Sequence, residues 1–337
     1  LVTSAVYAEN LEIINVVSEN TGAKSKTNVI TTESINRSTE TELKGLLKDE
    51  PAINFGGGRG TSQWFTIRGM GQDQVDVKVD DAYTDAQLFH HQGRFMFDPA
   101  LFKKVSVQKG TGSASAGIGA TSGAIVAETV SAKDLLKDGQ DIGFKLNAGV
   151  SSNKGWSKGA TVYSRAGMMD ALISGNWVNE SEYKAGNGYK IKNSALGQRG
   201  LLAKVGVDLN EDHRIELSHR QERHYGVRAL REEFDFAQDN NETNNSPRYR
   251  ITTNDTSKIE WTGKNMGFIS NAKANVWRSV ISREEPSEHS RTRLITNGAN
   301  LNLDTPIGES HLIKYGVNYR DQEGKPNSLT VLSLIHI

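Results

Sequence analysis

The sequence predicts a compact α/β unit over residues 29–130, followed by the strands of a large antiparallel β-structure. Up to about residue 130, short apolar runs alternate with glycines and polar stretches, whereas beyond about residue 140 the apolar residues recur with a period of two. Strands with one apolar and one polar face suit either a large soluble sheet or a lipid-facing barrel with a wet interior. Long polar inserts at 180–198 and 221–257 alternate with short turns such as 210–212, and this contrast favours the barrel.

The first unit contains short predicted elements. Residues 41–47 predict a helix that ends before Pro51, and strands are predicted at 64–67, 75–79, 105–108 and 124–130. Small residues dominate 105–127, a composition that suits tight packing in a confined space better than phosphate binding or catalysis.

Beyond residue 140, alternation predicts strands at 144–150, 201–209, 266–276 and 313–319. In the second of these, Leu201 and Val205 share one face and Lys204 lies on the other. The residues after position 140 are enough for roughly eight to ten strands with their loops.

Composition excludes several classes of function. The chain is 36% hydrophobic, and no segment approaches the ~18 consecutive apolar residues of a membrane helix. Forty basic and forty acidic residues cancel, so net charge gives no argument for a nucleic-acid partner. The chain has no cysteine, which excludes disulfides, thiolate metal sites and cysteine nucleophiles.

The glycine-rich segments lack the companions that enzymatic motifs need. No Gly-Lys-Ser/Thr follows the glycines at 56–60, and the Gly-Thr-Gly at 110–112 lacks the third glycine of a dinucleotide-binding loop. Asp80 and Asp81 fit a turn better than acid chemistry, and no Ser-His-Asp spacing stands out. We therefore predict turns at these places and no enzymatic activity.

The N-terminal residues have two distinct features. Val6 and Ala8 occupy the minus-three and minus-one positions of a signal-peptide cleavage site, so residues 1–8 are interpreted as a signal-peptide remnant, with an ordinary disordered terminus as the alternative. Residues 11–17 form a lone β-prone apolar patch that is suited to pair with the sheet edge of a partner.

Several segments resemble a known family. In the first unit these are 46–58, 65–72, 91–95, 98–101 and 105–126, and later in the chain they are 212–219, 231–234 and 312–320. They resemble TonB-dependent outer-membrane receptors and, more narrowly, the FrpB/FetA family of iron-regulated ferric enterobactin receptors. The resemblance implies an α+β plug domain followed by the first strands of a large antiparallel transmembrane β-barrel of about 22 strands.

The domain boundaries follow from this resemblance. Residues 1–8 are assigned to the signal-peptide remnant, 9–28 to a TonB-box segment and linker, 29–138 to the plug and 139–337 to the first part of the barrel. Residues 329–337 depart from the family pattern, and an incomplete barrel leaves strand edges unpaired in lipid, so the chain is interpreted as an N-terminal fragment of a longer receptor.

The resemblance also assigns roles to residues. The candidate TonB box consists of Glu12, Ile13, Ile14, Asn15, Val16 and Val17, with an edge strand of the plug as the alternative reading. Structural positions of the plug are Arg68, Gly69, Gly71, Gly117 and Gly119. Arg68 is expected to form a structural ion pair, because an unpaired charge in a confined site is unfavourable.

Two segments supply candidate ligand-binding residues. Residues 83–95 follow an alternating strand, and plug topology would place them where ligand arrives. They contribute Tyr83, His90, His91 and Arg94, with Tyr83 and His91 as candidates for indirect iron contact. The insert after His219 contributes Arg220, Arg223, Arg228 and Arg231, which suit a trianionic ferric catecholate. The alternatives are a solvated loop and arginines paired with Glu222, Glu232 and Glu233.

The resulting hypothesis is a receptor that binds a ferric siderophore, of the catecholate, enterobactin-like kind, and imports it into the periplasm. No intrinsic cofactor is expected, because iron is carried with the ligand. The expected partners are the TonB protein of the inner membrane, the ferric siderophore and the lipid bilayer of the outer membrane, with no nucleic acid. A haem or haemoglobin receptor is one alternative, supported by His90 and His91, and a passive porin or adhesin is another.

Overall fold

The computed structural model describes residues 27–56, 59–60, 63–84, 88, 92–93, 95–110, 121–229, 231–232, 246–308 and 311–326. Several predicted features lie outside these ranges. They are the signal-peptide remnant at 1–8, the departure at 329–337, and Glu12, Ile13, Ile14, Asn15, Val16, Val17, His90, His91, Arg94, Gly117 and Gly119.

The first unit contains two small sheets and short helices. Its strands are β1 (Thr27–Ile30), β2 (Ile53–Gly56), β3 (Trp64–Ile67), β4 (Met70–Gly71), β5 (Val75–Val79), β6 (Ala82–Tyr83), β7 (Phe102–Lys109) and β8 (Gly123–Thr129). Its helices are α2 (Thr32–Arg37), α3 (Leu43–Leu46) and α4 (Ala132–Leu135), with 3-10 turns η2 (Gln72–Gln74) and η3 (Pro99–Leu101). One sheet has the order β1-β7-β8-β5-β6, in which β5 and β8 are parallel, and the other has the order β2-β3-β4.

The predicted elements of this unit largely agree with the structure. The strands at 64–67 and 75–79 coincide with β3 and β5, and those at 105–108 and 124–130 lie mainly within β7 and β8. The helix expected at 41–47 is shorter, because only α3 forms there. Its N-cap residue, Glu42, makes no side-chain cap hydrogen bond and instead accepts hydrogen bonds from Arg59 and from the amide of Gly60.

The hydrophobic core joins the first unit to the strands that follow it. Phe65, Ile67 and Leu101 are fully buried at its centre. Tyr163 and Leu202, which belong to later strands, pack into the same cluster. The two parts of the chain therefore share one core.

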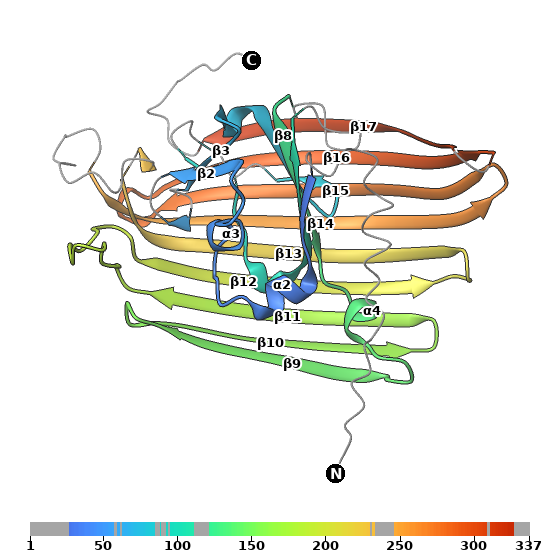
Figure 1. Cartoon of the computed structure of the whole chain (residues 1–337), viewed down its shortest axis with the longest axis horizontal. Helices are drawn as coiled ribbons and strands as arrows, with labels where there is room; N and C mark the ends of the chain where they lie inside the picture. The colour runs from blue at the N-terminus through green and yellow to red at the C-terminus, as the bar shows by residue number, and fades with distance from the viewer. Residues whose placement is uncertain are drawn as a thin grey trace, which may run out of the picture.

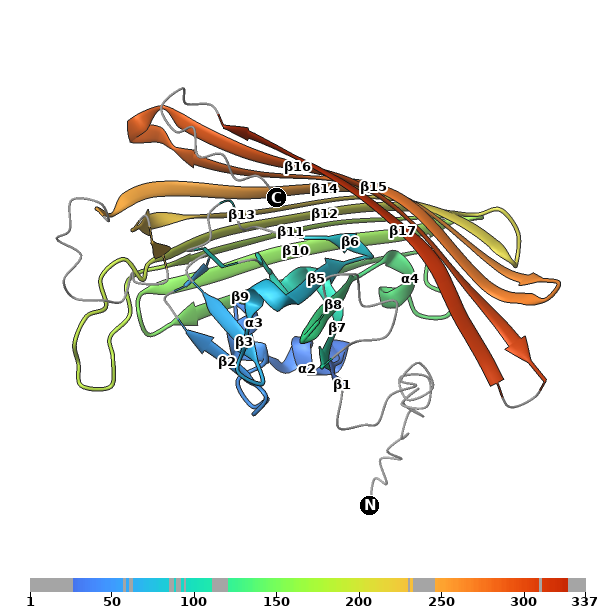
Figure 2. The same cartoon turned by 90° about the horizontal axis from the view of Figure 1, so that it is seen from above.

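A large sheet follows. Its strands are β9 (Ile142–Ser151), β10 (Gly155–Ala166), β11 (Met169–Glu180), β12 (Leu196–Asp208), β13 (His213–Arg228), β14 (Arg248–Met266), β15 (Ile269–Glu285), β16 (Ser290–Ile307) and β17 (His311–Pro326). The nine strands pair in sequence order and are antiparallel, within the expected eight to ten. The 3-10 turn η6 (Pro286–Glu288) joins β15 to β16. Seen from above, the sheet curves over the first unit, which lies on its concave side (Figures 1 and 2).

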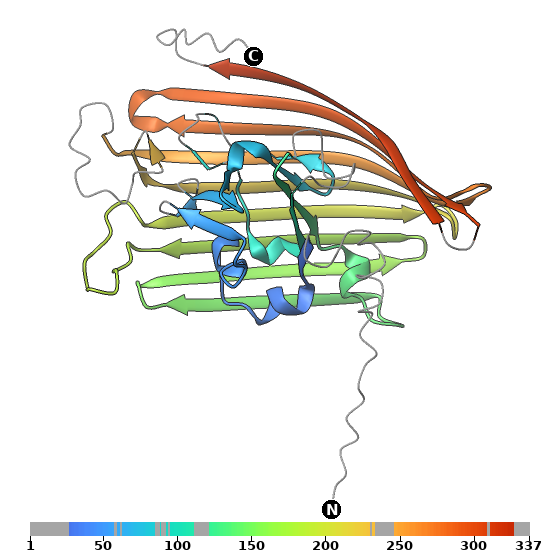
Figure 3. The same ribbon diagram turned by 45° about the horizontal axis from the view of Figure 1, so that its top comes forward.

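Each strand of the sheet separates its side chains onto two faces. In β11, Ile173 and Trp177 are exposed, whereas Leu172, Ser174 and Asn176 are buried beneath the first unit. The convex face is consequently exposed and largely apolar in its middle, and the concave face is polar. The first unit covers part of the concave face (Figure 3).

Two expectations about the sheet were wrong. The stretch 266–276 is not one strand, because Asn265 and Gly267 both have positive φ and turn the chain between β14 and β15. The stretch 221–257 is not a single insert, because β13 continues to Arg228 and β14 begins at Arg248. Residues 220–224 are polar on both faces, so alternation of apolar residues could not reveal the extra length of β13.

The connections differ in length between the two ends of the sheet. At one end, the strands are joined by short turns at 167–168, 209–212 and 267–268, whereas at the other end lie the longer segments 181–195 and 229–247. This asymmetry agrees with the expectation from the sequence. None of the helices in the described ranges has the length and apolar content needed to cross a membrane.

Candidate functional site

Two consecutive aspartates form the tip of a hairpin between β5 and β6. Asp80 and Asp81 have φ angles of 49° and 65°, as the two-residue hairpin turn closed by Val79 and Ala82 requires. The interpretation of this pair as a turn is therefore confirmed. Asp80 forms a 3.7 Å ion pair with Lys204 of β12, and Asp81 forms a 2.6 Å ion pair with Lys273 of β15.

The pKa values of both aspartates lie below their usual range. Burial alone would raise the pKa of Asp80, but the positive charges of Lys204 and Lys258 and hydrogen bonds from Thr129 outweigh burial. Burial would likewise raise the pKa of Asp81, and the ammonium group of Lys273 reverses the effect. The turn is thus a pair of ionised carboxylates held against cations of the concave face.

A third aspartate, Asp98, precedes η3 and lies against the same face. Asn176 donates hydrogen bonds to both of its carboxylate oxygens at 2.9 and 3.0 Å, and its backbone N–H donates to Glu222 at 2.8 Å. A Cβ on Gly200 would lie 2.4 Å from Asp98 Oδ2, so only glycine permits this approach. Burial raises the pKa of Asp98, although the hydrogen bonds that Asn176 donates to its carboxylate partly oppose this effect.

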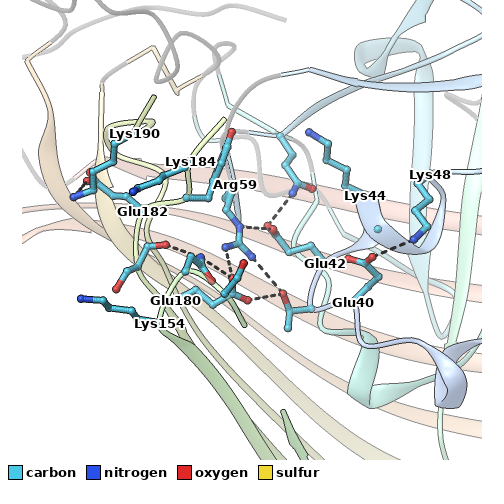
Figure 4. Close-up of a pocket in the computed structure, with 17 residues that line it drawn as sticks. Glu40, Glu42, Lys44, Lys48, Arg59, Lys154, Glu180, Glu182, Lys184 and Lys190 are labelled. Carbon is cyan, nitrogen blue, oxygen red and sulfur yellow. Dashed lines mark hydrogen bonds and ion pairs between the residues drawn. The ribbon is translucent and has the colours of Figure 1, made fainter. Parts of the chain in front are cut away.

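A partly buried ionic cluster links the first unit to the end of β11 (Figure 4). Arg59 donates to Glu42 at 2.8 Å and to Glu180 at 2.5 Å, and Gln63 also donates to Glu42. Burial would lower the pKa of Arg59, but the neighbouring carboxylates of Glu42 and Glu180 outweigh burial and raise it. The cluster holds Arg59 against the sheet and ties Gln63 to Glu42.

This cluster forms part of the wall of a cavity of about 1030 Å³ at the end of the sheet that carries the longer connections (Figure 4). Lys44, Lys154 and Lys184 line it without an ion pair among the described residues, whereas Lys190 pairs with Glu182 at 2.8 Å. Its charged lining can hold polar or anionic groups.

Tyr83 is the candidate ligand residue that the structure places most clearly. It is 7% exposed at the end of β6, where its ring packs beside Trp277 of β15 at a centroid distance of 6.4 Å. Lys78 Nζ and Arg320 Cζ lie 4.6 and 4.5 Å from the ring centroid. An aromatic ring with two cations is therefore present at this position.

The four candidate arginines do not converge on one site. Arg220 is buried in an ion pair with Glu222 on the concave face. Arg228 is also buried, and it donates to the backbone carbonyls of Asn193 and Ala195. Arg223 lies on the convex face, facing away from the first unit, and Arg231 is exposed beyond β13. Their assignment to ligand binding stays a prediction.

Arg68 and Gly69 occupy the two-residue turn between β3 and β4. Their φ angles are 51° and 80°, so glycine at position 69 relieves strain in this hairpin. Gly71 differs, because its φ is −66° and no atom lies within 4 Å of the place that a Cβ would occupy. The structure supplies no steric reason for glycine at position 71.

The ionic and hydrogen-bond tethers were not recognised from the sequence as a set. Alternation places Asn176 and Glu180 on one face of β11, but their partners Asp98 and Arg59 are far away in the chain. These residues therefore come into contact only in the folded protein. Within the described ranges, no three His, Asp or Glu side chains gather closely enough to hold a metal ion.

Comparison with known proteins gives consistent matches. Residues 19–124 match the model of the TonB-dependent receptor plug domain. The FrpB iron transporter of Neisseria meningitidis (F3-3 variant) is 46% identical, with a TM-score of 0.82 over 90% of this chain and 49% of its own. The haem transporter BhuA of Brucella suis biovar 1 is 30% identical over 204 residues, which are 60% of this chain and 31% of that protein.

A mutant of the ferric enterobactin receptor PfeA of Pseudomonas aeruginosa has a TM-score of 0.70 at 13% identity, covering 91% of this chain and 50% of its own. This match shows a shared fold alone. The chain spans about half the length of the FrpB chain and about a third of BhuA. The chain therefore carries the plug domain of a TonB-dependent receptor, followed by a nine-stranded antiparallel sheet that matches part of the barrel of such receptors.

Proposed function

We propose that this protein is an outer-membrane receptor that imports an iron-containing compound with energy supplied through TonB. The main support for the proposal is the position of the plug on the sheet. The plug lies on the polar concave face of the sheet, tied to it by Asp80, Asp98 and Arg59, while the opposite face is exposed. This arrangement suits a gate that closes a polar passage.

The proposed membrane contact is the convex face. Its exposed side chains include Phe144, Leu146, Ile173, Leu217, Ile259, Val276 and Val317. In hydrocarbon, the outer edges of β9 and β17 would lack hydrogen-bond partners, so the proposal includes further strands that close the barrel. The end with the longer connections would face the outside of the cell.

For the substrate we favour a ferric siderophore of the catecholate class. Support comes from the 46% identity to an iron transporter over 90% of this chain, and from the aromatic and cationic surroundings of Tyr83. Arginine, lysine and aromatic faces suit an anionic aromatic ligand. Haem is the second candidate, because BhuA, a haem transporter, is 30% identical over 60% of this chain.

The deciding experiment uses the full-length receptor in detergent micelles, titrated in parallel with ferric enterobactin, iron-free enterobactin and haem. The proposal expects tight binding of the ferric complex and weaker binding of the iron-free form, because iron loading creates the trianion. Tight haem binding with none for either enterobactin form would favour the second candidate. Uptake of the bound compound that persists without TonB would contradict the proposed energy source.

A further inference from the structure

Basic side chains interrupt the convex face where its apolar band ends. Arg199 of β12, Arg223 of β13 and Arg278 of β15 lie on this face, and we call them the arginine patch. Arg199 lies two residues from Leu201, and Arg278 two residues from Val276, each displaced toward the end with the longer connections. The patch therefore follows directly after the apolar band.

The positive charges of the arginine patch are not balanced by carboxylates of the described residues. Arg199 and Arg223 are direct cross-strand partners, a placement of like charges that disfavours the sheet. None of the three arginines forms an ion pair with a described residue, and Arg223 Nε is buried without a hydrogen-bond partner. Arg199 lies 5.6 Å from the ring of Tyr225, which orients it but does not neutralise it.

Two other cations on this face do have carboxylate partners. Arg291 pairs with Glu284 at 3.2 Å, and Lys325 pairs with Glu323 at 3.1 Å. The three arginines of the patch have no such partner among the described residues, which leaves a site for an external anion.

An apolar groove adjoins the patch. It has a volume of about 540 Å³, and its lining includes Val205, Leu217, Ile259 and Val276. His219, whose Nδ1 lies 2.9 Å from Ser257 Oγ, and Arg278 line its polar end. The groove can hold an acyl chain, and its polar end leads to the arginines.

We propose that the groove and the arginine patch together bind a lipid with a phosphate-bearing headgroup. This inference rests on the proposed function, because that function places the convex face in a bilayer. The acyl chain lies along the four aliphatic side chains, and the headgroup phosphates accept hydrogen bonds from Arg199, Arg223 and Arg278. A guanidinium group can donate two parallel hydrogen bonds to the oxygens of one phosphate. A neutral headgroup would leave the like charges of Arg199 and Arg223 uncompensated.

The test uses the full-length receptor in phosphatidylcholine nanodiscs that contain a small fraction of bisphosphorylated lipid A. Lipid retained by the receptor after detergent extraction is counted by native mass spectrometry. The variant Arg199→Gln/Arg223→Gln/Arg278→Gln should retain about tenfold less lipid A, because each basic group near an anionic lipid contributes to binding. The control Arg165→Gln/Arg291→Gln/Lys325→Gln removes three cations that have carboxylate partners, and it should retain lipid A as the wild type does.

A second arm compares wild-type receptor with lipid A and with its dephosphorylated form, so the result does not depend on folding of a variant. We expect retention of the phosphorylated form only, and inorganic phosphate should not displace it, because the groove also binds the acyl chain. Equal retention of both forms would overturn the inference. If the receptor inserts into nanodiscs and cells that carry it import iron, but the receptor shows no preference for phosphorylated lipid, only the lipid site is refuted. If the receptor does not insert into nanodiscs at all, the proposed function is refuted.

Discussion

Gly200 and Asp98 are in direct contact across the boundary between plug and barrel strands. Because Gly200 has no Cβ, the carboxylate of Asp98 can lie directly against its backbone. A Cβ at this position would lie 2.4 Å from Asp98 Oδ2 and 3.0 Å from Leu101 Cδ1. The same carboxylate is held by Asn176 from the neighbouring strand. One missing side chain thus determines how closely the plug approaches the sheet.

The variant Gly200→Ala should weaken this seating. Its methyl group must displace Asp98 and disturb both hydrogen bonds from Asn176, which should reduce the free energy of unfolding by about 1–3 kcal/mol. Urea unfolding of the full-length receptor in micelles measures the change. Gly324→Ala is the matched control in a strand, because no atom lies within 4 Å of its Cβ position. Equal loss in both variants would contradict the role of the contact.

The variant Arg59→Ala should loosen the plug at the cluster with Glu42 and Glu180. Removing the guanidinium leaves two carboxylates that are only 12% and 11% exposed without their cation. A loss of about 2–3 kcal/mol is expected, less than for a fully buried pair. Hydrogen exchange of the plug amides at 59–60 and 63–67 should speed up accordingly, and the double variant Arg59→Ala/Glu180→Ala should be less than additive. Strict additivity would show that the two residues do not interact.

The exposed and buried faces of the barrel strands could be predicted from the sequence. Leu201 and Val205 are 38% and 39% exposed, and Lys204 between them is 6% exposed, as alternation requires. The hairpin turn at Asp80 and Asp81 was also predictable, because aspartate tolerates the left-handed conformation at both positions. In each case the signal is local.

The remaining features of the fold and of the site could not be predicted from the sequence, because they depend on contacts between residues far apart in the chain. Arg59 and Glu180 are separated by 121 positions, and no local pattern indicates that they meet. The extension of β13 through Arg220 and Glu222 was hidden for a different reason, because a charged pair buried on the concave face looks like a polar loop in the sequence. Plug coverage, which makes such burial favourable, is a property of the tertiary structure.

The stability of the plug should depend on pH through Asp80. Its pKa is lowered in the folded protein, so its stabilising effect is present above the unfolded pKa of about 4 and is lost as pH falls through the folded value. Asp80→Asn should therefore be less stable than wild type at neutral pH, and this difference should shrink on acidification below about pH 4. Urea unfolding over this range tests the sign.

The control for this experiment is Asp138→Asn, at an exposed position that forms no ion pair with any described residue. It should follow the wild type at every pH. A difference between Asp80→Asn and wild type that grows on acidification would contradict the assigned ion pair with Lys204. Asp98, whose pKa is raised, acts in the opposite sense: its ionisation opposes folding as pH rises.

Deletion of residues 11–17 should abolish uptake and leave ligand binding intact. The patch is predicted to pair as a strand with TonB, and it precedes the described structure, so its removal disturbs none of the described contacts. Radioactive iron uptake by cells and binding by the purified receptor measure the two effects separately. Replacement of the polar residues 20–26 by a Gly-Ser linker of equal length should leave uptake unchanged. Loss of binding as well as uptake on deletion would refute the assignment.

The hydroxyl of Tyr83 should contribute to ligand affinity. Tyr83→Phe keeps the ring between Lys78, Arg320 and Trp277, so packing and the cation-ring contacts persist while the hydroxyl is lost. Affinity for ferric enterobactin should fall about tenfold, because one hydrogen bond or metal contact is removed. The triple variant Tyr83→Phe/His90→Ala/His91→Ala should bind more weakly still.

The matched control for Tyr83 is Tyr163→Phe. Tyr163 is 9% exposed, against 7% for Tyr83, and packs into the core shared by plug and sheet, outside the cluster with Trp277. Loss of its hydroxyl should leave affinity unchanged. If the triple variant binds ferric enterobactin as tightly as the wild type, then the 83–95 segment does not contact the ligand. The cavity bordered by Arg59 would then be the better candidate, because Lys44, Lys154 and Lys184, which form no ion pair with a described residue, can bind an anionic complex.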